Sequence, residues 1–373
     1  MTGINLIPDD LLRERLVALT RDLILIPSDA TRPREIDRGL AFLKNHLEAL
    51  PHIQIQDFKC KGDRGVLALP EDCQHPQVLL CGHLDVITHS AVSDYRSHIH
   101  EGKIVGPGAG DMKGQLAIMF EVFRSFNSQH PEASLGLAIT TDEERGGEHG
   151  TRYLFEDLGM RCGAALIPDG GGLNEVIIEE KGMVHLKLTS EGHASHAARP
   201  WLGINPLEAL IGQIQSIQDA FHQGSDDKDH WHPTCTVTII ESSNRSPNRI
   251  PAIAKAFLDI RFPRPLTVAN VLDSIKERLQ ANTDFKVIIA DEPSHLSPDP
   301  LFIQSTEKIT GRPVRLIKSH GGSDARFICR YDIPTMVSSP FVGELHSTEE
   351  WIDIESMVTF YRVYEDYLQT KLL

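Results

Sequence analysis

The segment 77–158 decides the fold, because strand-like and helix-like runs alternate along it. QVLLCGH (77–83) is an apolar run of strand length, and GQLAIMFEVFRSF (114–126) carries apolar residues at helical spacing. SLGLAITTDEE (134–144) begins as a second apolar strand, and a helix is predicted for EHGTRYLFEDL (148–158). This alternation favours an α/β fold with a mainly parallel sheet that helices cover.

The segments on either side extend the same pattern. Apolar residues at helical spacing predict helices over 9–26 and 33–50. IQIQDF (53–58) and GVLALP (65–70) have the composition of strands, and a last helix is predicted over 351–368.

The region 181–290 has a different order of elements. It reads as strand, helix, strand, strand, helix, strand, over 183–192, 205–221, 234–242, 252–262, 267–282 and 285–291. That order is the ferredoxin-like split unit. We therefore expect a catalytic domain of residues 1–180 and 291–373, with an inserted ferredoxin-like α+β domain at 181–290.

The overall composition excludes several classes of partner. The 373 residues include 37 Lys and Arg against 52 Asp and Glu, a net charge of −15, which disfavours nucleic acid and anionic membrane surfaces. MTGINLIPDD lacks the features of a signal peptide, and no long uncharged apolar stretch predicts a membrane span. The six scattered cysteines form no C-x-x-C pair, which favours reduced thiols and a cytoplasmic location.

The first motif with chemical potential is CGHLDV. His83 and Asp85 lie two residues apart, so on a strand their side chains point to the same face. A carboxylate beside a histidine can fix the ring for metal binding. Taken alone, however, this short motif favours a structural histidine at a strand end, because three-letter motifs recur by accident.

The second motif is the glycine-rich GPGAGDMKG (106–114), which contains Asp111. A phosphate-binding loop is excluded, because Lys113 is followed by Gly114 and Gln115 rather than by Ser or Thr. A metal ligand or a plain turn both remain open for this loop.

The third motif, TTDEERGGEHG (140–150), places consecutive carboxylates after an apolar strand. At a strand end, Glu143 and Glu144 can both turn toward one cleft, so that one binds a metal and the other accepts a proton from water. Taken by itself, the motif favours a solvated acidic loop, and Asp142 is expected to be such a solvated residue.

Two further residues complete an ordered set. Asp169 ends a strand in ALIPDGGG (165–172), and His346 precedes the last helix in FVGELHSTEEW (341–351). His83, Glu143 and Asp169 each follow an apolar run, and the carboxyl ends of parallel strands share one edge of a sheet. We therefore expect these three side chains to lie close together.

The order H-x-D, G-D-x-K-G, E-E, D, H resembles the zinc metallopeptidase and deacylase family of succinyl-diaminopimelate desuccinylase, acetylornithine deacetylase, carboxypeptidase G and bacterial di- and tripeptidases. The resemblance covers nearly the whole chain. It implies hydrolysis of an amide bond by a zinc-activated water, with two Zn²⁺ per chain that Co²⁺ or Mn²⁺ can replace. The implied metal ligands are His83, Asp111, Glu144, Asp169 and His346.

The resemblance also implies individual roles. His83 and Asp169 would bind one zinc, Glu144 and His346 the other, and Asp111 would bridge them. Glu143 would be the general base, and Asp85 would hydrogen-bond His83.

The inserted domain resembles the family's lid and dimerisation domain. In GHASHAARPWLGINP (192–206), His196 corresponds to a histidine that reaches the partner subunit's site and stabilises the oxyanion. A homodimer is therefore expected. Asn248 and Arg261 correspond to substrate-binding positions, and GGSDARF (321–327) resembles a carboxylate-binding loop that includes Gly322, Ser323 and Arg326.

Substrate class is the point on which the motifs disagree. Asp169 stands where desuccinylases and deacetylases usually have glutamate, which resembles the di- and tripeptidase branch, whereas GGSDARF resembles the desuccinylase branch. We expect an N-acyl amino acid, with a dipeptide or another short peptide as the alternative. A non-catalytic metal-binding scaffold is disfavoured, because it has no use for a free base such as Glu143, and a single-metal amidase relative is a further alternative.

Overall fold

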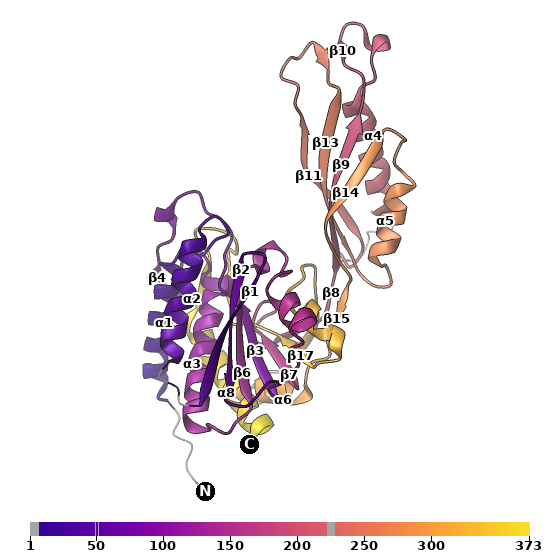
Figure 1. Ribbon diagram of the computed structural model, residues 1–373. Coiled ribbons are helices and arrows are strands. Elements are labelled where there is room, and N and C mark those ends of the chain that lie inside the picture. The colour runs from indigo at the N-terminus through magenta and orange to yellow at the C-terminus, as the bar shows by residue number, and fades with distance from the viewer. Residues whose placement is uncertain (1–6, 49, 51, 222–227) are drawn as a thin grey trace. The chain divides into compact units, whose positions relative to one another are not determined.

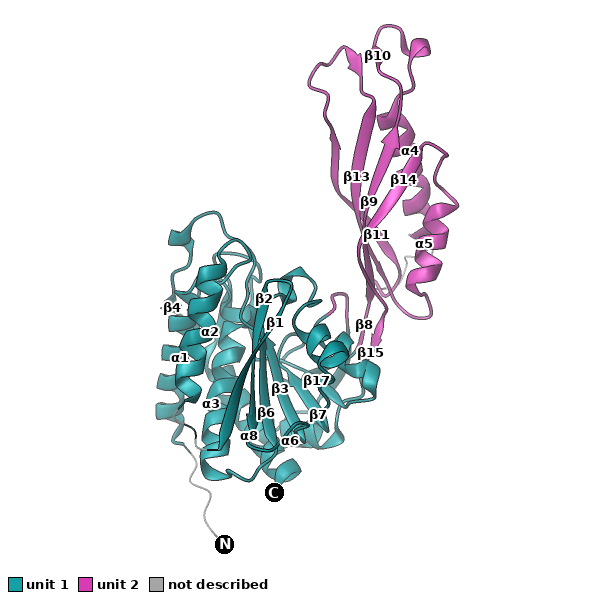
Figure 2. Cartoon of the chain, viewed as in Figure 1, with its two compact units in different colours: residues 1–178, 295–318, 323–373 teal, residues 179–294, 319–322 magenta. Residues whose placement is uncertain are grey.

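The computed structural model describes residues 7–48, 50, 52–221 and 228–373. The chain forms two compact units (Figure 2). Unit 1 comprises Met1–Ile178, His295–Lys318 and Ser323–Leu373, and unit 2 comprises Glu179–Ser294 and Ser319–Gly322. The region 181–290, predicted as an inserted domain, falls within unit 2.

Unit 1 is built on a six-stranded sheet with helices packed against it (Figure 1). The strands, in spatial order, are β1 (Ile53–Cys60), β2 (Asp63–Pro70), β6 (Leu135–Thr140), β3 (Val78–His83), β7 (Ala164–Ile167) and β17 (Thr335–Val337). β6, β3, β7 and β17 pair in parallel, and β1 and β2 are antiparallel. The predicted α/β class with a mainly parallel sheet is confirmed.

Side chains of β3 alternate between two hydrophobic clusters, one on each face of the sheet. Val78 and Leu80 belong to the larger cluster, and Leu79 and Cys81 belong to the smaller one. Because both faces are buried, this strand is a continuous apolar run rather than an alternating one. The helices of unit 1 are α1 (Asp9–Ile24), α2 (Pro33–Leu47), α3 (Gly114–Gln129), α6 (Pro300–Thr310), α7 (Ala325–Ile328) and α8 (Ile354–Leu372).

The small sheets of unit 1 explain one departure from the predicted helices. The last helix was predicted from residue 351, but Trp351–Asp353 forms strand β19, which pairs with β5 (Lys103–Val105) and β18 (Val342–Gly343). The helix begins after it, where the Asp353 side chain accepts a hydrogen bond from the Ser356 N–H at 2.7 Å. Further short strands are β4 (His98–His100) in unit 1, and β8 (Glu175–Glu180), β15 (Ser294–His295) and β16 (Arg315–Ser319), each of which has residues in both units.

Unit 2 is an antiparallel sheet with two helices. Its four strands, in spatial order, are β11 (Thr234–Ser242), β13 (Ile253–Phe262), β9 (Gly182–Glu191) and β14 (Thr283–Asp291), and its helices are α4 (Pro206–Phe221) and α5 (Val268–Lys276). This arrangement confirms the ferredoxin-like prediction. α5 ends six residues earlier than predicted, because Gln213 accepts a hydrogen bond from the Gln280 N–H at 2.8 Å in the turn toward β14.

A two-stranded pair, β10 (Ser195–His196) and β12 (Arg249–Ile250), completes unit 2. In the part of the chain that the structure describes, no helix has the length and apolar character needed to cross a membrane.

Candidate metal centre

The sheet of unit 1 carries the candidate centre at the carboxyl ends of its parallel strands. His83 is the last residue of β3, Asp169 follows β7 by two residues, and Glu143 follows β6 by three. The loop before α3 supplies Asp111, and the segment before β19 supplies His346. Residues far apart in sequence therefore meet at one edge of the sheet.

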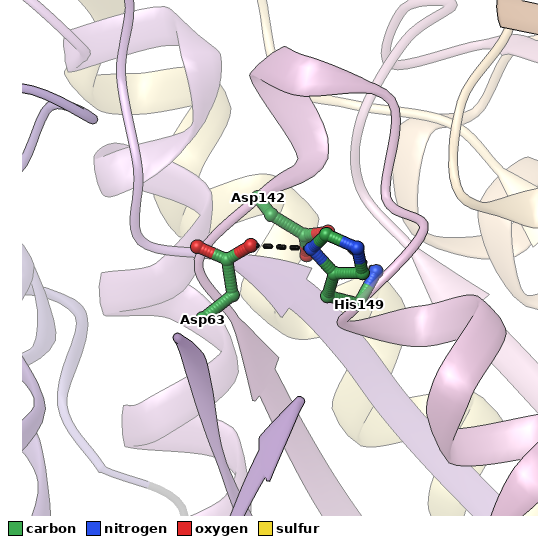
Figure 3. Close-up of side chains that lie close together, drawn as sticks. All are labelled: Asp63, Asp142 and His149. Atoms are coloured by element: carbon green, nitrogen blue, oxygen red, sulfur yellow. Dashed lines mark hydrogen bonds and ion pairs between the residues drawn. The ribbon is translucent and has the colours of Figure 1, made fainter. Parts of the chain in front are cut away.

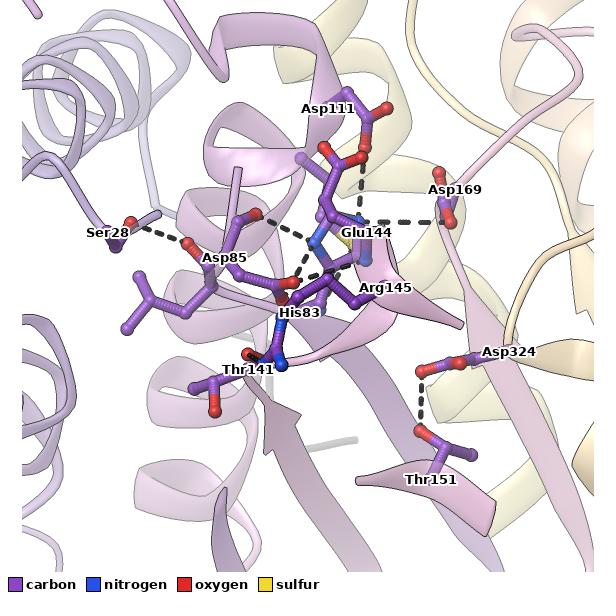
Figure 4. Close-up of polar contacts among 12 residues, drawn as sticks. Ser28, His83, Asp85, Asp111, Thr141, Glu144, Arg145, Thr151, Asp169 and Asp324 are labelled. Carbon is purple, nitrogen blue, oxygen red and sulfur yellow. Dashed lines mark hydrogen bonds and ion pairs between the residues drawn. The ribbon is translucent and has the colours of Figure 1, made fainter. Parts of the chain in front are cut away.

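Asp111 lies between the two histidines (Figure 4 shows its contact with His83). Its Oδ1 is 3.1 Å from His83 Nε2, and its Oδ2 is 3.2 Å from His346 Nε2. Asp169 Oδ2 lies 3.9 Å from the same nitrogen of His83, and Glu144 Oε2 lies 3.4 Å from the same nitrogen of His346. Each oxygen of one carboxylate thus faces a separate histidine, as a bridging ligand requires.

The donor atoms fall into two groups that could each hold a metal ion. His83, Glu143 and Asp169 form one group, and Asp111, Glu144 and His346 form the other, with the ligand atoms of each group within 4.8 Å of one another. Imidazole nitrogen and carboxylate oxygen are the donors that zinc binds in catalytic sites. The side chains present therefore fit two divalent cations.

The electrostatics of these side chains also favour a bound cation. Burial and the Asp111 carboxylate raise the pKa of Glu144 to about 8. The hydrogen bond to Asp111 raises the pKa of His346 to about 9, against the effect of partial burial. Four carboxylates concentrated in one partly buried site repel one another, and a divalent cation removes that repulsion.

Asp85 contacts one residue of each ligand group, His83 and Glu144. Its backbone oxygen is 2.9 Å from His83 Nδ1, while its carboxylate Oδ1 is 3.5 Å from the same nitrogen. Its Oδ2 accepts a hydrogen bond from the Glu144 N–H at 3.1 Å. The backbone carbonyl is therefore the nearer partner of His83, and the carboxylate ties the His83 strand to the turn that carries Glu144.

Asp142 was expected to be solvated, and the structure corrects this. Its side chain is only 2% exposed and accepts a hydrogen bond from the His149 N–H at 2.7 Å. Figure 3 shows it beside His149, whose Nδ1 is 2.6 Å from Asp63 Oδ2. Asp63 also accepts from Arg145 at 2.6 Å. This network anchors the turn of Glu143 and Glu144 to β2, so Asp142 has a structural role.

Arg326, which is predicted to bind a substrate carboxylate, makes two hydrogen bonds to backbone carbonyls of unit 1. It is 4% exposed, and its Nη1 and Nη2 donate to the backbone carbonyls of Ser323 at 2.7 Å and Gly146 at 2.9 Å. Its bonds therefore connect α7 to the loop that follows the Glu143 turn. Ser323 is 3% exposed, and Gly322 belongs to unit 2.

The remaining predicted residues lie in unit 2. His196 is exposed on β10, and Asn248 lies beside it, because the Ala197 N–H donates to the Asn248 carbonyl at 2.8 Å. Arg261 is on β13, where Nε and Nη2 donate to the two Asp259 oxygens at 2.7 and 3.1 Å. Unit 2 thus groups His196 with Asn248, whereas Arg261 pairs with an internal carboxylate.

Sequence reasoning missed two buried charged residues of the ligand loops. Lys113 is 0% exposed and donates to the Ile26 carbonyl at 2.6 Å. Glu350 is 2% exposed and accepts hydrogen bonds from ligand-loop backbone. The loop around Lys113 is buried, whereas the residues just before Glu350 are mostly exposed, so no local pattern marked both residues as buried.

Two histidines around a shared carboxylate at a sheet edge could hold the pair of divalent cations that hydrolytic metalloenzymes use. Residues 79–370 match the family model described as Peptidase family M20/M25/M40. The chain belongs to this family. It is accordingly a hydrolytic enzyme, a metallopeptidase.

The chain is also similar to individual proteins, in sequence to the first and in fold to the other two. The chain is 27% identical over 318 residues to a succinyl-diaminopimelate desuccinylase of Parvibaculum lavamentivorans, covering 79% of this chain and 80% of that protein. An M20 family metallo-carboxypeptidase of Sulfolobus solfataricus has the same fold, with a TM-score of 0.80 and 18% identity over 96% of this chain and 98% of that one. The aminopeptidase PepT of Bacillus cereus gives a TM-score of 0.76 and 20% identity, over 96% and 98% of the two chains.

Proposed function

We propose that this enzyme hydrolyses the amide bond of an N-acyl amino acid, with two divalent cations held in unit 1. The observation that carries the proposal is Asp111, whose two oxygens face His83 and His346 separately. The relative in Parvibaculum lavamentivorans, a desuccinylase by name, supports the acyl class of substrate.

The proposed ligands are His83 and Asp169 for one cation, Glu144 and His346 for the other, and Asp111 for both. When bound, the cations supply a Lewis acid that polarises the scissile carbonyl and lowers the pKa of water. Zinc is the ion we propose, with Co²⁺ and Mn²⁺ as substitutes.

Glu143 is proposed as the general base. It follows β6 on the same turn as Glu144 and lies with His83 and Asp169. Its carboxylate would take a proton from the attacking water and pass it to the departing amine nitrogen. Asp85 and Arg326 would hold the strand end and the turn in place during this transfer.

The first test compares matched substrates. We expect kcat/KM for N-succinyl or N-acetyl amino acids to exceed that for glycyl dipeptides with the same carboxyl-side residue. The physical reason is that a dipeptide needs an acidic partner for its free ammonium group, and carboxylates that bind metal have little charge to spare. A preference for the glycyl dipeptides of tenfold or more, about 1.4 kcal/mol of transition-state binding, would reverse the ranking.

A dipeptidase is the second candidate, because Asp169 resembles the peptidase branch at that position. Glu143→Gln protein purified in parallel controls for contaminating peptidase, since it should cleave neither substrate class. A non-catalytic scaffold would show no turnover that depends on Glu143.

We also propose that unit 2 forms a homodimer and that His196 acts in the partner's site. β11 is an edge strand of its sheet, and its Ile239 and Ile240 are each 49% exposed, which favours pairing with another copy. The cytoplasmic location predicted from the cysteines stays a prediction.

Mixing two inactive variants tests the role of His196. After subunit exchange, Glu143→Gln and His196→Ala chains should regain about a quarter of the parent activity, since half of the dimers are mixed and each owns one complete site. Exchange is verified with differently tagged chains. If exchange is complete and no activity returns, His196 acts within its own chain or has no catalytic role.

A further inference from the structure

Glu350 contacts the candidate metal centre but belongs to none of the three groups of described side chains that could hold a metal ion. Its side chain is 2% exposed, in a segment where the neighbouring Glu349 is exposed. A buried carboxylate must be hydrogen-bonded to be tolerated. The identity of its donors therefore indicates what Glu350 does.

Backbone N–H groups from two separate loops donate to this one carboxylate. Gly110 N and Asp111 N each lie 2.7 Å from Oε1, and His346 N lies 3.2 Å from Oε2. The backbone carbonyl of Glu350 also accepts from the Gly106 N–H at 2.7 Å. Glu350 thus contacts the main chain of the proposed bridging ligand and of the proposed histidine ligand at once.

The backbone of one loop is strained, and the two loops pack closely, so a contact that fixes them relative to each other stabilises both. His346 has φ of 65°, a left-handed conformation that is unfavourable for a residue with a Cβ atom. An added Cβ at Gly110 would lie 2.9 Å from side-chain atoms of both Leu345 and Val342. The two loops therefore pack too closely to admit a side chain at Gly110. A fixed acceptor between the loops offsets this strain and sets their spacing.

We propose that Glu350 is a positioning residue that holds Asp111 and His346 in register for metal binding, without binding metal itself. The inference rests on the proposed metal centre for its functional meaning. Its structural part, the joining of two loops by one carboxylate, is separable and can be tested without metal.

The test compares Glu350→Gln with Glu349→Gln. The first replaces one acceptor oxygen by an amide N–H₂ that meets other N–H donors, whereas the second removes the same charge from the exposed neighbour. In metal-free protein, hydrogen exchange at the Gly110, Asp111 and His346 amides should accelerate at least tenfold in Glu350→Gln alone. Under chelator competition, its dissociation constants for Zn²⁺ should rise at least tenfold, with substrate KM at saturating metal within threefold of the parent.

Parent-like exchange in Glu350→Gln would overturn the proposal, as would parent-like zinc affinity. If Glu350→Gln does not fold, Glu350→Asp supplies the test: the shorter carboxylate should weaken zinc binding measurably and leave the far side of unit 1 unaltered. Unchanged zinc affinity in a folded Glu350→Asp would then contradict the role. If the parent protein binds no zinc, the proposed metal centre is wrong. The hydrogen-exchange result would still test whether Glu350 joins the two loops.

Discussion

Glu143→Gln is expected to lower kcat by about 10²–10⁴-fold or more, while two divalent cations remain bound. The amide keeps the shape of the side chain but cannot accept the proton of the attacking water. Burial and the Asp169 carboxylate hold the pKa of Glu143 well above its usual range, an environment in which bound cations would restore the base form. Steady-state kinetics and elemental analysis of the same preparation measure both quantities.

Glu144→Gln is the matched contrast, because it makes the same chemical change one residue away. Glu144 faces His346 at 3.4 Å, so its loss should remove the cation of that group and lower activity through metal loss. Excess metal should then restore part of the activity of Glu144→Gln and none of that of Glu143→Gln. Metal loss from Glu143→Gln, or activity within tenfold of the parent, would show that Glu143 is a ligand or a bystander.

Asp111→Ala is expected to disturb both cations and reduce kcat/KM by at least 10³-fold. Among the residues that the structure describes, Asp111 is the one whose two carboxylate oxygens face both His83 and His346, so we expect no neighbour to replace it. Calorimetric titration of the metal-free variant should show weakened binding of both equivalents. Asp57→Ala, an exposed change on β1, is the control and should bind metal as the parent does. Retention of one cation at parent affinity in Asp111→Ala would mean that Asp111 serves a single site.

Much of this architecture was predictable because hydrophobic periodicity is local. The buried run of β3 and the amphipathic helices carry their signal within a few residues, and the strand ends then place His83, Glu143 and Asp169 at one edge. The ferredoxin-like order of unit 2 was equally visible, because each of its strands and helices carries its own local apolar pattern.

What the sequence did not predict depends on partners that are distant along the chain. Arg326 meets a carbonyl 180 positions away, and Glu350 meets the Asp111 amide 239 positions away. Asp142 is buried because His149 and the β2 side chain Asp63 close over it. Such long-range contacts leave no periodic pattern in the sequence. A buried charged residue and a solvated one therefore cannot be told apart from their neighbours in the sequence.

The most direct test of the central claim is the titration of metal-free parent protein with Zn²⁺, followed by calorimetry and by turnover of an N-acyl amino acid in the same samples. We predict two equivalents per chain, no turnover in the metal-free protein, and turnover that appears as the equivalents bind. Full turnover in metal-free protein, or at one equivalent with no second binding event, would contradict the two-cation account.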